Sequence, residues 1–319
     1  GVFGAVYDRD STGKIIVHHQ IAENKEELIP LQNSKYVQSN AYVVYNLVKQ
    51  KLDSGKLVLF TGTPCQIAAL YNILNKKYDN LYTIENICHG VPSTLLFQSY
   101  LEFWENKNNA KIVSIRFRDK TLGWGKTPKI IYIDKNGKKK EKVFQYYKSS
   151  YFMMFLKGDI LRESCYNCKF ASEYRVADMT LGDYWGVEWE HPELLSKNGG
   201  HIVNKHGVSC VICNTNKADY LLDLIKANIY IADSKYEKIS PHNLQLLYPF
   251  PRSKNRQIIL QTYLNEGYKA IDRMSHKFYS IKTWKGLMRV KITTFFKETR
   301  GFKVIYGILK NIKIVRETN

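Results

Sequence analysis

The sequence has no charge-free run of about eighteen apolar residues, so none of its helices is expected to span a membrane. It also shows no signal peptide, internal repeat or low-complexity segment. Only six of the 319 residues are cysteine, too few and too irregularly placed for the disulfide framework of a secreted protein. These absences favour a cytoplasmic protein whose thiolates bind metal. Because the chain begins at Gly1 inside a strand-like run, we expect a preceding N-terminal part to be missing.

Acidic residues are also scarce, with 29 against 48 lysines and arginines, which gives a net charge of +19. Residues 251–319 contain 16 basic and 4 acidic residues and so contribute +12 of this excess. We therefore expect two parts: a domain at residues 1–250 and a basic helical C-terminal extension at residues 251–319. The extension is expected to contact an acidic partner or an anionic membrane surface. In the second case the protein would be peripheral at the inner membrane face. The alternative is that the extension is only a solvated helical face.

Apolar residues in the extension recur at helical spacing with lysine and arginine beside them, as a membrane-surface helix requires. These apolar residues are Ile281, Trp284, Met288, Ile292 and Phe295. Nucleic acid is not an expected partner of the protein in this interpretation.

Two strand–turn–helix units follow one another in the first third of the chain. The expected strands are Leu57–Phe60 and Leu81–Ile87, and the expected helices are Gln66–Leu74 and Thr94–Trp104. This order predicts an α/β fold, a mixed sheet with flanking helices. Ligands of such sheets bind at the carboxyl ends of the strands, and Cys65 and Cys88 both lie there.

The remaining patterns extend this prediction. We expect a hairpin from Val2–Tyr7 and Ile15–His18, strands at Ile112–Arg118 and Val208–Asn214, helices at Ala41–Leu52 and Ala218–Ala227, and a basic hairpin that turns at Lys135–Lys138.

The other four cysteines form two pairs of equal spacing and different setting. Cys165 and Cys168 lie on a short polar segment, where a turn can bring both thiols to one metal; free surface thiols are the alternative. Cys210 and Cys213 lie in a β-branched run, and in a strand such positions face opposite sides. We therefore expect Cys210 and Cys213 to be packing residues. A zinc site built from both pairs, in a non-enzymatic binding protein that uses the basic tail, remains the alternative.

The segment Thr61–Cys65 permits two further interpretations. Cys65 could act as a nucleophile with His89 as its base, although no oxyanion-binding arrangement is evident. The same segment leads into a helix N-terminus, whose backbone N–H groups can bind phosphate. His89 by itself is more often a structural residue than a ligand.

Several motifs in order give the chain a resemblance to a known family. They are Ser34–Ser39, Gly62–Gln66, Cys88–Ser93, Phe117–Lys120 with Gly123 and Trp124, Ser164–Cys168, and Thr180–Gly186. Together they resemble the coenzyme F420 hydrogenase/dehydrogenase beta-subunit family, over roughly residues 1–250. Bacterial members include some from polysaccharide-synthesis gene clusters, and members usually carry an N-terminal ferredoxin domain that is absent here.

The resemblance implies an iron–sulfur flavoprotein oxidoreductase. It places a 4Fe-4S cluster on Cys65, Cys88, Cys165 and Cys168, and FAD beside it at the carboxyl edge of the sheet. Electrons would pass between a ferredoxin domain or other donor, the cluster, FAD and a two-electron substrate such as coenzyme F420. From motif position and donor chemistry, the expected flavin contacts are Lys35, Gln38, Ser39, Thr63 and Lys120.

Overall fold

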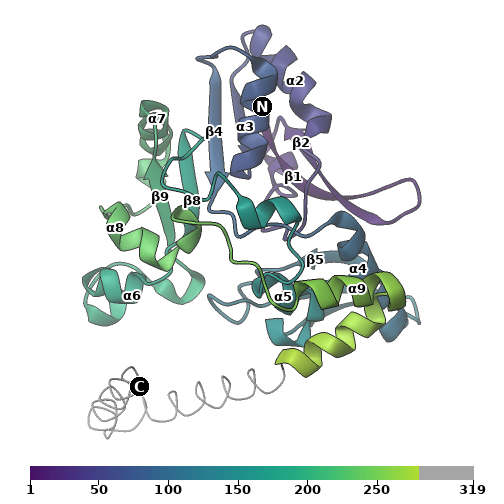
Figure 1. Ribbon diagram of the computed structural model, residues 1–319. Coiled ribbons are helices and arrows are strands. Elements are labelled where there is room, and N and C mark those ends of the chain that lie inside the picture. The colour runs from purple at the N-terminus through teal and green to yellow at the C-terminus, as the bar shows by residue number, and fades with distance from the viewer. Residues whose placement is uncertain (280–319) are drawn as a thin grey trace, which may run out of the picture.

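The computed structural model describes residues 1–279, and its centre is a six-stranded mixed sheet (Figure 1). The strands are β1 (Val2–Arg9), β2 (Ile15–Ala22), β3 (Val58–Gly62), β4 (Leu81–Asn86), β8 (Met179–Asp183) and β9 (Ser209–Cys213). Their order in space is β2-β1-β3-β4-β8-β9. The four central strands are mutually parallel, and β2 and β9 are antiparallel to their neighbours. The predicted α/β fold with a mixed sheet is confirmed.

Helices pack against this sheet and beside it. They are α1 (Lys25–Leu28), α2 (Tyr42–Asp53), α3 (Pro64–Leu74), α4 (Thr94–Asn108), α5 (Ser150–Leu156), α6 (Val187–Glu190), α7 (Asn216–Ile225), α8 (Tyr236–Ile239) and α9 (Arg256–Glu266). The apolar stripes of α2 and α3 cover β3, where Val48, Ile67 and Leu70 are fully buried with Phe60. Burying one such side chain contributes about 1.5–3 kcal/mol to stability, so this contact fixes the β3–α3 unit.

A second, three-stranded antiparallel sheet contains β5 (Ala110–Arg116), β6 (Lys129–Asp134) and β7 (Lys139–Val143), in that order. The strand expected at residues 112–118 therefore starts earlier and belongs to this separate sheet. Between it and α5 lies an aromatic core in which Phe97, Phe117, Tyr151 and Phe152 are almost completely buried. Figure 1 shows β5, α4, α5 and α9 together at the lower end of the molecule.

Most elements expected from the sequence are present within a few residues of their predicted bounds. The main shift concerns α3, which begins at Pro64 and therefore includes Cys65 in its first turn. Proline is favoured in the first turn because its missing N–H has no partner there in any helix. Thr63, rather than the predicted Cys65, is thus the residue at which loop becomes helix.

The chain after residue 250 contributes to the core of the described part. Ile259 of α9 and Ile271, within a helical stretch at residues 268–279, are both fully buried in the aromatic core. The predicted division between residues 250 and 251 stays a prediction. The amphipathic segments expected near residues 281–296 and 302–315, with their membrane contact, lie outside the described residues.

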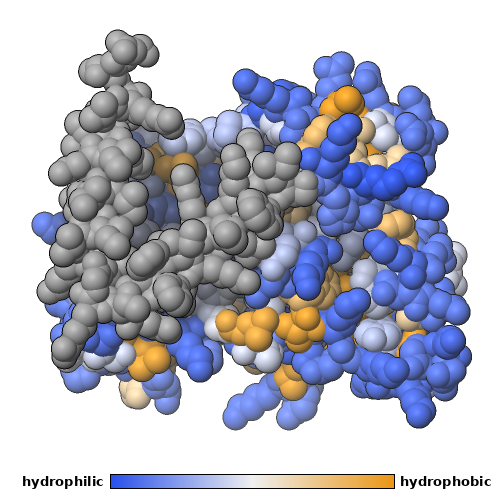
Figure 2. Space-filling model, turned by 90° about the horizontal axis from the view of Figure 1, so that it is seen from below, coloured by the Kyte–Doolittle hydropathy of each residue, from blue (hydrophilic) through white to orange (hydrophobic). Residues whose placement is uncertain are grey.

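Among residues 1–279, no helix combines the length and apolar character that crossing a membrane requires. The face of the molecule drawn in Figure 2 is mainly hydrophilic, with small separate groups of hydrophobic residues between the charged ones.

Candidate functional site

The candidate site lies at the carboxyl edge of the parallel strands. Strands β3 and β4 pair in parallel from Val58 opposite Leu81 to Gly62 opposite Glu85, so both chains leave the sheet on the same side. Cys65 follows β3 in the first turn of α3, and Cys88 follows β4 after one intervening residue. The expectation that these two cysteines share one sheet edge is confirmed.

The segment with the other two cysteines is tied to the loop after β4. Leu161 forms an antiparallel bridge with Pro92, and the backbone N–H of Arg162 donates to the carbonyl of Val91 at 2.8 Å. A short 3₁₀ helix at Glu163–Asn167 then carries Cys165, with Cys168 immediately after it.

A glycine permits the close approach of these two segments. Gly90 has φ +108°, and a Cβ built on it would lie 2.8 Å from Leu161 Cδ1 and 3.2 Å from Cys165 Cβ. Only glycine adopts such a backbone without strain, and only glycine leaves room for the cysteine beside it.

The four thiols are close enough to affect one another electrostatically. Burial raises the pKa of the Cys88 thiol to about 12, and Cys65, Cys165 and Cys168 add to the increase. Burial also raises the pKa of Cys165, with further contributions from Cys65 and Cys168. Neighbouring thiolates disfavour each other, so such a set favours a cation that neutralises them.

Within residues 1–279, no three histidine, cysteine or carboxylate side chains have the arrangement of a metal-ion site. The four thiols are therefore neighbours on three segments, without the closed geometry that surrounds a single bound ion.

The last two cysteines lie elsewhere and differ from each other. Cys210 is buried in β9, and its Sγ lies 3.7 Å from the carbonyl oxygen of Asp183. Cys213 is exposed, so the prediction that both are packing residues is wrong for Cys213. The reason is the two-residue period of the strand, which turns positions 210 and 213 to opposite faces. This geometry also separates the thiols that the alternative zinc site requires.

Three of the five expected flavin-binding residues surround the start of α3. Gln38, Ser39 and Cys65 line an open hollow of about 510 Å³. The Ser39 hydroxyl is 2.7 Å from His19 Nδ1, so it is already engaged inside the protein. Thr63 caps α3 together with Gln66 Oε1, which accepts from the Thr63 N–H at 2.9 Å. Gln38 and Thr63 thus lie beside Cys65, each at a loop that can reach a ligand.

The two expected lysines are placed differently. Lys35 Nζ donates to the backbone carbonyls of Pro30, Leu31 and Gln32 at 2.7–2.9 Å. Burial lowers the pKa of this ammonium group to about 8. Its three donors hold a turn together, whereas Lys120 is exposed.

Sequence reasoning missed a polar and aromatic group at the end of β8. Asp183 accepts from Arg118 at 2.8 Å and from the Trp124 indole N–H at 3.1 Å. The rings of Trp124 and Trp185 stack with centroids 4.8 Å apart and planes 2° from parallel. The motifs were visible in the sequence, but only the fold shows that they meet at the carboxyl edge.

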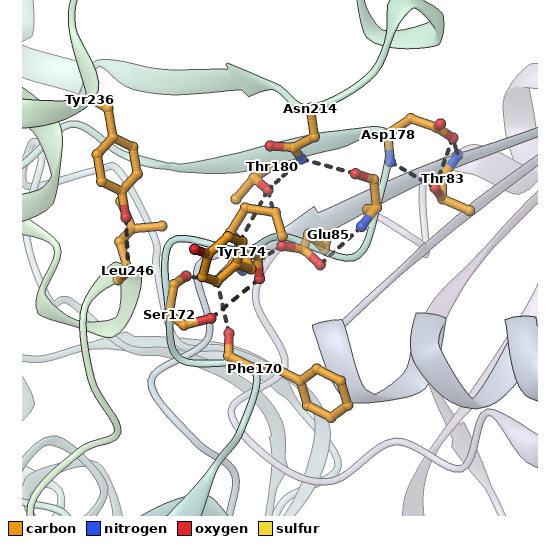
Figure 3. A network of polar contacts seen from close by, with 12 residues as sticks. Thr83, Glu85, Phe170, Ser172, Tyr174, Asp178, Thr180, Asn214, Tyr236 and Leu246 are labelled. Carbon is orange, nitrogen blue, oxygen red and sulfur yellow. Dashed lines mark hydrogen bonds and ion pairs between the residues drawn. The ribbon is translucent and has the colours of Figure 1, made fainter.

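A buried polar network was also missed, and it anchors the segment that follows Cys168 (Figure 3). Arg175 forms an ion pair with Glu85 of β4, and both side chains are almost inaccessible. Glu85 also accepts from the Thr180 hydroxyl at 3.0 Å, and Arg175 donates to the carbonyl of Phe170 at 2.9 Å. The carboxylate thereby joins β4, β8 and the cysteine segment.

The interpretation of Cys65 and His89 as a nucleophile and base gains no support from the surroundings of His89. Its Nε2 lies 3.2 Å from the carbonyl oxygen of Phe155, and the ring packs against Phe155 and Phe250. Burial lowers the pKa of His89 to about 4. The ring is a neutral packing residue beside the cysteines.

The fold and the site define an α/β protein with two cysteines at the carboxyl edge of its sheet and two more on a segment bridged to the loop beside it. Residues 55–238 match the model of a protein family described as the C terminus of the beta subunit of coenzyme F420 hydrogenase/dehydrogenase. The chain therefore belongs to this family, whose description indicates part of a hydrogenase- or dehydrogenase-type oxidoreductase.

A search of curated proteins found no match. Among solved structures, one similar chain belongs to the F420-reducing NiFe hydrogenase complex from Methanosarcina barkeri. It is 13% identical with a TM-score of 0.42, and the match covers 86% of this chain and 78% of that one.

Proposed function

We propose that this protein is an iron–sulfur flavoprotein that passes electrons between a 4Fe-4S cluster, FAD and a two-electron substrate such as coenzyme F420. Membership of the family supports the redox class. The observation that most supports the proposal is that Cys65 and Cys88 follow strands at the same sheet edge, where Gly90 lies against Cys165. Four thiolates are the usual ligand set of such a cluster, so the donor chemistry fits.

In this proposal each segment has a distinct role. The cluster is held by the four cysteines, and the Gly90 loop keeps Cys88 and Cys165 adjacent. FAD would lie in the hollow beside Cys65, which Gln38 and the first turns of α3 line, and the dipole of α3 would favour its phosphates there. The flavin supplies the exchange between single electrons and electron pairs.

The five expected flavin contacts divide by what their polar atoms already bind. Lys35 and Ser39 act through the protein in this proposal, because they bind backbone carbonyls and His19 respectively. Gln38 lines the hollow, although its Oε1 already accepts from Arg162 at 2.8 Å. Thr63 caps α3 next to Cys65, and Lys120 is exposed. We assign Arg118 and Asp183, which pair at the end of β8, to binding or orienting the two-electron substrate.

Anaerobic reconstitution with iron, sulfide and FAD tests the proposal. The wild-type chain should bind about four irons and one flavin and should bleach with dithionite. Single serine variants of Cys65, Cys88, Cys165 and Cys168 should lose most iron, because a hydroxyl is a poor ligand for this soft site. Cys210→Ser is the matched control and should keep its iron. Full iron retention in all four variants would refute the ligand assignment.

Flavin and substrate are tested separately. Reduced, cluster-loaded protein should transfer electron pairs to coenzyme F420 or to another soluble hydride acceptor only when FAD is bound. If the cluster-loaded protein binds no flavin, the protein is a one-electron carrier and the two-electron part of the proposal is wrong.

A further inference from the structure

Positive charge is concentrated on the three-stranded sheet and its connections. Residues 111–148 contain 12 lysines and arginines and only 3 acidic residues, a net charge of +9. Residues 1–250 together carry +7, so the remainder of that range sums to −2. The excess within this range therefore belongs to one structural unit and is not spread over the whole surface.

The sheet presents part of this charge on its outer face. Lys111, Ile133 and Lys139 lie opposite one another across β5, β6 and β7, and so share one face of the sheet. Tyr132, next along β6, packs on Trp104 of α4 and marks the inner face. Ile133 is 41% exposed on the outer face, where apolar surface lies among the cations.

Only some of these cations are paired with a carboxylate. Lys111, Lys129 and Lys140 form ion pairs with Glu105, Glu141 and Asp134 respectively. Over residues 1–279, the structure shows no ion pair for Arg116, Lys135, Lys138 or Lys139. Strand β7 is also an edge strand of its sheet. So is β5, and lysines on an edge discourage pairing with another strand. That purpose does not account for the lysines of the segments that connect β5 to β6 and β6 to β7.

The basic sheet is continuous with the candidate site. The segment between β5 and β6 contains Arg118 and Trp124, which contact Asp183 and stack on Trp185. A protein bound on the outer face would therefore rest on the same unit that contacts Asp183 and Trp185.

We propose that the outer face of the β5–β6–β7 sheet docks an acidic protein that exchanges single electrons with this one. The inference rests on the proposed function, which needs a one-electron donor or acceptor. Complementary charge steers such encounters and accelerates association by about tenfold or more. Exposed Ile133 and Val113 supply the apolar contact that the centre of a transient interface needs.

The test uses a small acidic ferredoxin as the probe and the triple variant Lys135→Glu, Lys138→Glu and Lys139→Glu. Stopped-flow mixing measures how fast the reduced ferredoxin reduces the cofactor-loaded protein at low ionic strength. The variant should react at least about tenfold more slowly than wild type, and the difference should shrink in high salt. Reduction by dithionite, a small molecule, should proceed at equal rates in both proteins.

The matched control replaces the exposed Lys25, Lys56 and Lys197 with glutamate, so its net charge changes by the same amount. It should keep most of the wild-type rate with ferredoxin. Equal rates for the two triple variants would overturn the docking proposal, because net charge alone would then explain the effect.

Binding without electron transfer separates the two hypotheses. Anisotropy of labelled ferredoxin should show weaker binding to the sheet variant even in protein without cofactors. If dithionite bleaches no cofactor, the proposed function is wrong. The anisotropy measurement still shows whether ferredoxin binds the sheet. Tighter binding of single-stranded DNA or phosphatidylserine vesicles than of ferredoxin would overturn the assignment of an acidic protein as the partner.

Discussion

Glu85 and Arg175 form an ion pair in the interior, where their side chains are 0% and 2% exposed. Glu85 lies in β4, three residues before Cys88, and Arg175 lies seven residues after Cys168. The pair thus connects two of the three segments that bring the cysteines together. The same ion pair therefore stabilises the sheet and holds the cysteine segments in place.

Removing one partner of this pair should destabilise the protein strongly. Arg175→Met leaves the Glu85 carboxylate buried without its counter-charge, which costs about 3–5 kcal/mol. Urea unfolding of the wild type and the variant measures this loss. Lys49→Met is the control, because its pair with Asp53 at 3.1 Å is exposed and should contribute less than about 1 kcal/mol. Equal losses in the two variants would contradict the interior role of Glu85.

A methyl group on Gly90 should disturb the cysteines as well as the backbone. Gly90→Ala adds a Cβ 2.8 Å from Leu161 and 3.2 Å from Cys165 Cβ. Gly137→Ala is the matched control, since Gly137 has φ +74° and nothing within 4 Å of the added atom. The control should cost about 1–2 kcal/mol from backbone strain alone.

Thermal unfolding and iron content together distinguish the two glycines. Gly90→Ala should lose more stability than the control and should also bind less iron after reconstitution. If the two variants have the same stability and iron content, the contact between Gly90 and the Cys165 segment does not contribute to metal binding.

The two cysteines of β9 should respond unequally to truncation. Cys210→Ala removes a buried side chain and should cost about 1–2 kcal/mol. Cys213→Ala changes an exposed position and should stay within about 0.5 kcal/mol of wild type. Denaturant unfolding measures both values, and iron content should be unchanged in each variant. Loss of bound metal from either one would revive the zinc alternative that uses these thiols.

The buried His19 should make the protein less stable in mild acid. Burial lowers the pKa of His19 to about 4, and its ring nitrogens contact the Ser39 hydroxyl at 2.7 Å and the Thr61 carbonyl at 3.0 Å. Between about pH 6.5 and pH 4 the unfolded state binds the proton that the folded state excludes. Stability should therefore fall as the pH is lowered across this window, by about 1.4 kcal/mol per unit.

Urea unfolding at several pH values isolates this contribution. The slope should become shallower in His19→Gln, and the exposed His206→Gln controls for removing a histidine from the surface. An unchanged slope in His19→Gln would show that other groups cause the acid sensitivity.

Local patterns in the sequence were sufficient to predict most of the strands and helices and the shared edge of Cys65 and Cys88. Hydrophobic periodicity and turn residues act over a few positions, so neighbouring residues contain this information. The opposite orientations of Cys210 and Cys213 also follow from strand geometry, although the sequence did not show which of them faces solvent.

Long-range contacts decided the remainder. The ion pair of Glu85 with Arg175 spans 90 positions, and the contact of Arg118 with Asp183 spans 65. The sequence displayed these residues, but their partners follow from the order of β4 and β8 in the sheet. The partners of Lys35 could not be predicted from the sequence either, because its ammonium group donates to nearby backbone carbonyls only when the turn has formed. Local chemistry therefore determined the elements and the edge on which the cysteines lie, and tertiary packing determined which charged and aromatic residues surround them.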